Sequence, residues 1–376
     1  MQPHYDNLLL IYYSGTGNSK RVSEWIAGKA LERGINIHIA SYNQFDPEAV
    51  KAWKGKTLIG FFSATHGFNM PHSMLKFILR FNLCNGSDVF VGNTRAGMKL
   101  SKLFMPGLSG VAMYFPALML LLKGYKVRAM YPVDLPSNWI SLHPGLRRKV
   151  IDSMVDHYSQ LVRSFAEKVL SGQRVFLRSL ILLPLDILVI PLALGYYFVG
   201  RYILAKTFVA SYKCNNCEIC MKQCPTQSII LSGGRPYWKF TCESCMKCMN
   251  NCPERAIETA HSMVFVLIFI LSAWVNPWIT GKVTQLVSFA FGESWMAYKI
   301  LHFLFQWSVW LIVFFAGYKV VHYLMRFPVF NKMITYTSLT TWKFWRRYRM
   351  PALRLPSTPF DSAQGPSLRD RKREGK

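Results

Sequence analysis

The sequence predicts an α/β doubly wound parallel sheet, followed by a small cysteine-rich α+β domain and a transmembrane helical hairpin. Three observations support this fold class. Short apolar runs alternate with helix-like segments over residues 1–172, as in parallel α/β sheets. Eight of the nine cysteines lie within residues 213–260. Two long apolar stretches follow within residues 261–326, and each approaches the roughly 20 residues that a spanning helix needs.

The composition favours a protein that contacts a membrane. Hydrophobic residues make up 51% of the 376 positions and charged residues only 17%, which excludes disorder for most of the chain. Lys and Arg outnumber Asp and Glu by 45 to 19, a net charge of +26. Such a balance suits nucleic acid or an anionic membrane surface. Because much of the charge flanks apolar segments, we expect membrane lipid and not nucleic acid as the partner.

The elements of the first domain follow from its apolar pattern. Buried strands are predicted at residues 8–13, 57–62, 89–92 and 127–131, with a weaker strand at 34–41. Helices are predicted at residues 19–33, 71–80, 107–122 and 146–170. The chain begins without a basic region followed by an apolar run, so we recognise no export signal and expect this domain in the cytoplasm.

A glycine-rich turn joins the first strand to the first helix. It reads Ser14-Gly15-Thr16-Gly17-Asn18-Ser19. Backbone N–H groups converge at such a turn, and the helix dipole adds positive potential, so the turn predicts an anion site. The hydroxyls of Ser14, Thr16 and Ser19 can donate hydrogen bonds to phosphate oxygens. The spacing fits neither the GxxxxGK[ST] loop nor GxGxxG, and we expect no NAD(P) site.

This turn resembles the FMN phosphate loop of flavodoxins, which is rich in Ser, Thr and Gly. The resemblance implies two further flavin-binding loops after the third and fourth strands, at residues 63–69 and 93–97. The FMN contacts it implies are Ser14, Gly15, Thr16, Gly17, Asn18, Ser19, Thr65, His66, Gly67, Phe68, Asn93, Thr94 and Gly97. Flavodoxins usually stack the ring on Trp or Tyr. Here Phe68, His66 and Trp139 remain alternatives, and His66 could bond the flavin or cap its loop.

The cysteine-rich segment contains an internal duplication. The pattern C-x2-C-x2-C-x3-C-P begins at Cys214 and recurs 28 residues later at Cys242. Paired zinc knuckles would not explain the third closely spaced cysteine or the prolines. Disulfides are disfavoured in a reducing compartment.

This run resembles that of bacterial ferredoxins, in which the fourth cysteine ligates the other cluster. The resemblance implies two [4Fe–4S] clusters. Their ligands would be Cys214, Cys217, Cys220 and Cys252 for one, and Cys242, Cys245, Cys248 and Cys224 for the other. Over residues 1–260 the chain resembles the flavodoxin–ferredoxin fusion proteins of anaerobes.

The apolar segments predict how the chain meets a membrane. Residues 262–279 and 300–323 form a hairpin, with basic residues after the second span that place both ends in the cytoplasm. The alternatives are a pair of buried soluble helices and a haem held by histidines at the helix ends. Residues 177–205 contain two prolines and Asp186, which favours a broken helix on the cytoplasmic leaflet over a clean crossing. A crossing would separate flavin from clusters.

These features divide the chain into five parts. They are a flavodoxin-like domain (1–172), an apolar interfacial connector (173–212), a ferredoxin domain (213–260), a transmembrane hairpin (261–326) and a basic tail with a disordered distal part (327–376). The function expected is membrane-anchored electron transfer between two [4Fe–4S] clusters and FMN, with redox proteins as partners. Two alternatives remain: a flavoenzyme that reduces a quinone or small substrate, and an iron–sulfur membrane subunit with an empty flavin site.

Overall fold

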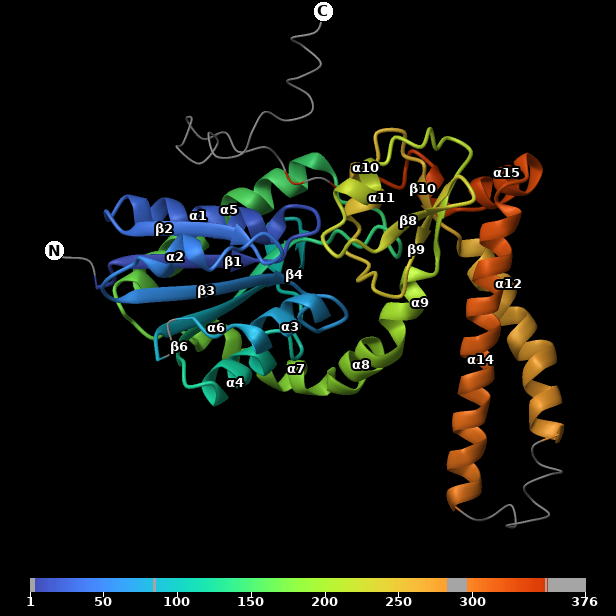
Figure 1. The fold of residues 1–376 in the computed structure, drawn as a ribbon, viewed down its shortest axis with the longest axis horizontal. Helices are drawn as coiled ribbons and strands as arrows, with labels where there is room; N and C mark the ends of the chain where they lie inside the picture. The colour runs from blue at the N-terminus through green and yellow to red at the C-terminus, as the bar shows by residue number, and fades with distance from the viewer. Residues whose placement is uncertain (1–3, 84–85, 283–295, 349, 351–376) are drawn as a thin grey trace, which may run out of the picture.

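The computed structural model describes residues 4–83, 86–282, 296–348 and 350. An α/β domain, a cysteine-rich domain and a long helical hairpin follow one another along the chain (Figure 1). A string of short helices runs along the α/β domain and connects it to the cysteine-rich domain.

The α/β domain is built on a parallel sheet with the order β2-β1-β3-β4-β6. These strands are β1 (Asn7–Tyr12), β2 (Asn36–Ser41), β3 (Thr57–Ala64), β4 (Asp88–Leu100) and β6 (Lys126–Pro136). This is the flavodoxin-like doubly wound order, in which ligands bind beyond the carboxyl ends of the central strands. The predicted parallel sheet is therefore confirmed. A short strand that the sequence did not predict, β5 (Leu103–Met105), pairs antiparallel with the end of β4.

Helices cover both faces of this sheet (Figure 1). One apolar core packs under α1 (Asn18–Leu31) and α5 (Arg148–Leu170). The other packs under α3 (His72–Arg80) and α4 (Tyr114–Leu122), with a short α2 (Glu48–Lys51) nearby in sequence. The helix predicted over 107–122 begins only at Tyr114, so that prediction was wrong in its first half. The backbone of residues 107–113 instead forms a loop whose N–H groups bind a buried carboxylate of the connector.

The connector contains five helical segments, of which the last three run on as one helix over Ile190–Ala205. They are α6 (Leu177–Leu180), α7 (Leu183–Leu188), α8 (Ile190–Gly195), the π-helical η1 (Tyr196–Gly200) and α9 (Arg201–Ala205). Pro184 and Pro191 stand at the starts of α7 and α8, where proline is tolerated and a preceding helix ends. Asp186 is buried and accepts hydrogen bonds from the N–H groups of Ser109 and Gly110, both at 2.8 Å. The connector therefore packs on the α/β domain, which contradicts a clean crossing.

The cysteine-rich domain is held by two small antiparallel pairs. The first joins β7 (Phe208–Ala210) to β10 (Ile257–Thr259), and the second joins β8 (Ile229–Ser232) to β9 (Arg235–Trp238). Helices α10 (Ile219–Lys222) and α11 (Lys247–Asn251) each carry the third cysteine of one repeat. Since β7 completes the first pair, this domain reaches back into the segment assigned to the connector by sequence.

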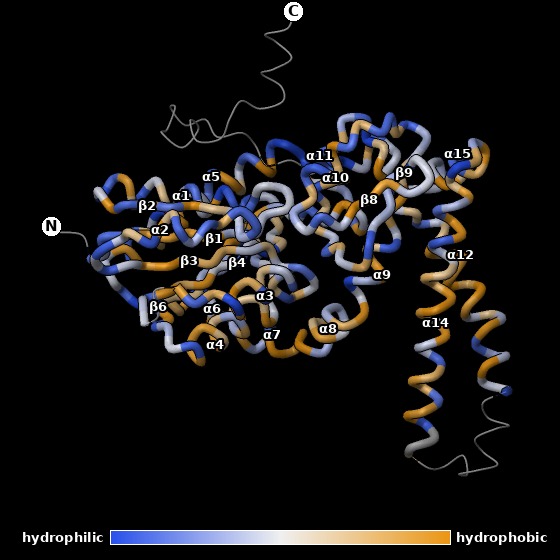
Figure 2. Tube along the Cα trace, viewed as in Figure 1, coloured by the Kyte–Doolittle hydropathy of each residue, from blue (hydrophilic) through white to orange (hydrophobic). Residues whose placement is uncertain are grey.

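Two helices could cross a membrane by length and composition, at His261–Lys282 and Lys299–Leu324. The first comprises α12 (His261–Ile270), the π-helical η2 (Leu271–Val275) and the residues to 282, and the second lies within α14 (Met296–Leu324). Only 17% and 6% of their most apolar stretches are buried, which does not fit the alternative of core helices in a soluble protein. Figure 2 shows many hydrophobic residues along both helices.

The beginning of the predicted basic tail is folded. After the hairpin, α15 (Pro328–Tyr336) and the 3-10 helix η3 (Leu339–Thr341) lead back across the cysteine-rich domain. Trp345 donates its indole N–H to the carbonyl oxygen of Ile140 at 2.6 Å, and Arg347 pairs with Glu258 at 3.3 Å. Residues 328–348 thus tie the two domains together. Residues 283–295 between the two helices lie outside the described residues. Residues 351–376, the part of the tail that the sequence predicts to be disordered, also lie outside them.

Candidate flavin and cluster sites

The glycine-rich turn ends in the first turn of α1. Gly17 has φ of 105°, a left-handed conformation that favours glycine, and α1 begins at the next residue. The first N–H groups of a helix have no carbonyl partner within the helix. They point out of the helix beside a cavity of about 160 Å³ that the turn lines. The residues present therefore fit an anionic group such as a phosphate.

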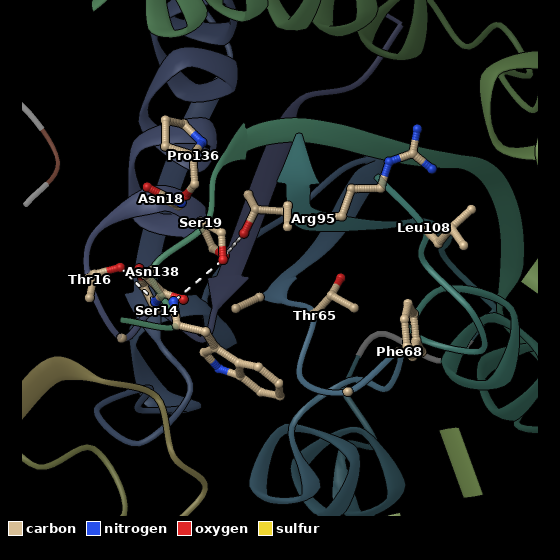
Figure 3. A pocket seen from close by; sticks show the side chains of 17 residues that line it. Ser14, Thr16, Asn18, Ser19, Thr65, Phe68, Arg95, Leu108, Pro136 and Asn138 are labelled. Carbon is tan, nitrogen blue, oxygen red and sulfur yellow. Dashed lines mark hydrogen bonds between the residues drawn. The ribbon is translucent and has the colours of Figure 1, made fainter. Parts of the chain in front are cut away.

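Hydroxyl groups of the turn are fixed by neighbouring loops. The Oγ of Ser14 accepts a hydrogen bond from the N–H of Gly17 at 3.1 Å. The amide of Asn138 donates to Thr16 Oγ1 at 2.8 Å, and the hydroxyls of Ser19 and Thr94 are 3.0 Å apart. Figure 3 shows Ser14, Thr16, Ser19 and Asn138 on one side of the cavity and Phe68 and Leu108 on the other.

The cavity collects most of the predicted flavin contacts. Those that line it are Ser14, Gly15, Thr16, Asn18, Ser19, Thr65, Gly67, Phe68 and Thr94. Trp139, one of the three aromatic alternatives, also lines it. Ala64, Arg95 and Ala96 also line it and belong to the two predicted loops, although they were not named as contacts. The lining residues that the sequence argument missed are Leu108, Pro136, Ser137 and Asn138. Pro136 ends β6 and residues 137–139 follow it, so the rule that parallel strands end at one edge could have pointed to them.

Four predicted contacts are not among the lining residues: Gly17, His66, Asn93 and Gly97. Gly17 lies at the base of the turn, and a Cβ on Gly97 would come within 2.6 Å of the Asp134 Cβ. Asn93 is buried and donates to Thr65 Oγ1 at 2.6 Å. It therefore positions a lining residue.

His66 lies behind the cavity wall. Its ring centroid is 6.0 Å from that of Trp139 and 5.6 Å from that of Tyr13. Neither ring nitrogen has a hydrogen-bond partner among the described residues. Burial lowers the pKa of His66 to about 4, so the imidazole is neutral at physiological pH. The structure places it as an uncharged ring between those of Tyr13 and Trp139.

The C-terminal segment reaches the phosphate loop. The hydroxyl of Tyr348 donates to Asn18 Oδ1, and Tyr348 is fully buried. A Cβ on Gly17 would come within 3.0 Å of the Met350 Cβ. No sequence pattern relates these distant positions, and only packing brings them together.

The eight cysteines fall into two groups in space. Burial raises the pKa of Cys220 to about 11, and the nearby thiols of Cys214, Cys252 and Cys217 raise it further. We call these four the distal set. Burial likewise raises the pKa of Cys248, and the neighbouring Cys242, Cys245 and Cys224 add to it. We call these the proximal set.

Each set takes its fourth cysteine from the other repeat. This grouping is the one that the ferredoxin resemblance implies, and the assignment of these cysteines as cluster ligands stays a prediction. Among the described residues, no three His, Cys, Asp or Glu side chains are arranged to hold a single metal ion, whereas the distal set surrounds a pocket. Thiolates spread around a space fit an iron–sulfur cluster, whose irons are distributed over a cage.

The proximal set lies against the phosphate loop. A Cβ on Gly15 would come within 2.4 Å of the Cys245 carbonyl oxygen. The same carbonyl accepts a hydrogen bond from the Asn138 amide at 3.4 Å. Glu243 lies between Cys242 and Cys245 in the sequence. Its carboxylate accepts hydrogen bonds from the N–H and Oγ of Ser73 at the start of α3, at 2.5 and 2.9 Å. The two domains are therefore locked together where their candidate sites meet.

Comparisons with known proteins match each domain separately. Residues 213–257 match the family described as 4Fe-4S dicluster domain. The solved structures that resemble the chain include three flavodoxins: one from Streptococcus pneumoniae TIGR4, one from the domain Archaea, and flavodoxin 1 from Bacillus cereus. Identities are 13%, 17% and 17%, and TM-scores are 0.28, 0.30 and 0.28. The matches cover 42%, 43% and 42% of this chain and 98%, 98% and 97% of those chains. No curated protein matches the chain.

Proposed function

We propose that this chain, which joins a flavodoxin-like domain to a 4Fe-4S dicluster domain, is a membrane-anchored electron-transfer protein. It passes electrons between two [4Fe–4S] clusters and a bound FMN. The observation that carries the proposal is the direct contact of Cys245 with Gly15 and Asn138, because it puts a cluster ligand against the flavin phosphate loop. FMN supplies chemistry in one- or two-electron steps, whereas each cluster exchanges one electron.

The two cysteine sets suggest the order of the centres. The proximal set touches the phosphate loop, and Cys245 packs on the apolar core of the α/β domain. In the distal set, Cys217 is exposed. We therefore place the docking surface for redox protein partners at the distal set and the flavin at the other end. The net charge of +26 favours acidic partners.

The chain's own residues divide the work of holding FMN. The N–H groups of the first turn of α1, with Thr16 and Ser14, would bind the phosphate. Phe68 and Trp139 offer aromatic surfaces in the same cavity for the flavin ring. His66 keeps Trp139 in place without adding charge.

Exposed apolar side chains support the membrane anchor. Besides the hairpin, the connector exposes Leu185, Leu188, Leu192 and Phe198, and the adjacent α4 exposes Leu122. Asp186 faces the other way, into the α/β domain. In Figure 2, α4, α7 and α8 carry much hydrophobic colour and lie on the side toward which the hairpin extends. These apolar side chains of the connector and α4 would contact the membrane lipid, with both redox domains in the cytoplasm.

Anaerobic purification tests the proposal. We expect about eight irons per chain, from two four-iron clusters, and one FMN. Reduction of the clusters in a stopped-flow experiment should be followed by reduction of the flavin at a rate independent of protein concentration. Full iron without FMN would contradict the proposal and favour the iron–sulfur subunit. A rate that rises with concentration would contradict intramolecular transfer.

A further inference from the structure

A second cavity, of about 550 Å³, lies where α3, α9 and the cysteine-rich domain meet. It shares no lining residue with the cavity at the phosphate loop. The side chains that matter here are Lys76, Arg201, Tyr202, Phe240 and Cys242. Its size is within the range of pockets that bind small organic ligands, about 300–1,000 Å³.

This cavity adjoins the proximal set directly. Cys242 lines it, and so does Pro225, the residue after Cys224. A molecule bound there would touch residues that ligate the proximal cluster. It could therefore exchange electrons with that cluster without entering the flavin cavity.

The lining chemistry suits a planar ring that carries hydrogen-bond acceptors. The rings of Tyr202 and Phe240 lie 6.1 Å apart, centroid to centroid. Lys76 and Arg201 supply cationic donors, and Arg201 Nε is buried without a hydrogen-bond partner among the described residues. A quinone head group combines an aromatic-sized ring with two carbonyl oxygens, which donors of this kind bind.

One of the candidate membrane helices contacts a residue that lines the same cavity. Phe240 is 46% exposed, and its ring lies 4.9 Å from that of Phe315 on α14, centroid to centroid. Arg201 and Tyr202 belong to α9, which Figure 1 shows rising from the apolar connector to the cysteine-rich domain. The cavity is therefore lined by α9 of the connector and by Phe240, which contacts the hairpin. A soluble anion would use the cations but would need none of these aromatic and membrane contacts.

We propose that this cavity binds the head group of a membrane quinone next to the proximal cluster. The inference rests on the proposed function, because the proximal cluster must be present. Reduction of quinone to quinol takes two electrons, supplied singly through the reduced [4Fe–4S] clusters, and two protons, supplied by water. This site is distinct from the flavin cavity, where the alternative function would reduce a quinone.

Photo-cross-linking of the full chain in nanodiscs, loaded with iron and FMN, tests the site. With a radiolabelled azido-quinone as probe, we expect the label on peptides containing residues 196–202 and 239–243. Arg201→Gln and Phe240→Ala should each reduce labelling at least fivefold. Arg80→Gln and Phe115→Ala replace exposed residues of the same types on α3 and α4 and should leave labelling unchanged.

The outcomes separate this proposal from the one on which it rests. Label on residues 64–68 or 136–139 would overturn it in favour of quinone binding at the flavin cavity. Absence of label above that on a denatured sample would overturn it as well. Iron, sulfide and FMN are measured on the same sample, so failure of the proposed function is read from missing cofactors.

Discussion

Thr16 joins the phosphate loop to the loop after β6 through its bond to Asn138. Its hydroxyl can also donate to a phosphate oxygen. Thr16→Ala should therefore weaken FMN binding by about 1.5–3 kcal/mol, the range for a hydrogen bond to a charged group. Fluorescence titration of the apoprotein measures this, and Thr16→Ser should restore most of the affinity. Equal affinity of the wild-type chain for FMN and riboflavin would rule out phosphate recognition by this loop.

Gly15 is required by its neighbour in the other domain. A Cβ there would meet the Cys245 carbonyl oxygen at 2.4 Å, a backbone atom that cannot move aside cheaply. We expect Gly15→Ala to shift the proximal-cluster EPR spectrum and to slow flavin reduction at least tenfold. Gly28→Ala on α1 is the matched control, since nothing lies within 4 Å of its added Cβ. If both variants behave like wild type, the two sites do not touch.

His66 predicts a dependence of stability on pH. Burial lowers its pKa to about 4 in the folded protein, against 6.5 for an unburied histidine. Between these values the unfolded chain takes up a proton and the folded chain does not, so stability is complete above pH 6.5 and falls as pH decreases toward 4. The loss at pH 5 is on the order of 2 kcal/mol. Burial lowers the pKa of His72 in the same direction.

Thermal release of FMN at pH 7 and pH 5 measures this effect. His66→Gln should reduce the difference between the two melting temperatures, because glutamine does not titrate. The exposed His4→Gln serves as control and should melt like wild type at both values. An unchanged pH dependence in His66→Gln would show that burial of this imidazole does not govern the transition.

At the scale of elements, the cysteine-rich domain exchanges ligands between its two repeats. Cys224 follows α10 in sequence, yet its thiol lies with Cys242, Cys245 and Cys248. Cys224→Ser should therefore damage the proximal cluster and leave the distal one intact. Cys217→Ser should do the reverse. EPR of the reduced variants decides, and loss of the distal signal in Cys224→Ser would contradict the crossed assignment.

The connector shows how polar contacts hold an apolar segment with two prolines against the α/β domain. Its prolines divide it, and α7, α8 and η1 are each fixed to the α/β domain by a polar contact. Asp186 binds two backbone N–H groups, Asn69 donates to the carbonyl oxygen of Ala193 at 2.7 Å, and His72 Nδ1 lies 2.7 Å from the Tyr197 hydroxyl. These contacts explain why an apolar segment of this length stays on one side of the domain.

At the scale of the whole molecule, both redox domains must share one compartment. We expect impermeant thiol labelling of intact cells to reach a cysteine placed at Ser294, between the two candidate spans. Cysteines placed at Ala49, on the α/β domain, and Met333, on α15, are both exposed on the protein and should react only after lysis. Labelling at Met333 but not at Ala49 in intact cells would place the domains on opposite sides, and transfer between them would have to be abandoned.

The sequence by itself determined the features that depend on neighbouring residues. Hydrophobic periodicity predicts the parallel sheet and the two apolar helices. Cysteine spacing predicts the dicluster domain, and the Ser-Gly-Thr-Gly turn predicts the phosphate loop. Each of these patterns is built from residues that are close in sequence within a strand, helix, turn or cysteine repeat, where backbone geometry alone relates them.

The tertiary structure decided everything that joins distant segments. Only packing brings Cys245 to Gly15, Tyr348 to Asn18, and Trp139 into the cavity with Phe68. His66, predicted as a flavin contact, does not line the cavity, and its ring lies beside those of Tyr13 and Trp139. Such contacts follow from how whole layers fit together, and a single sequence carries no local signal for them.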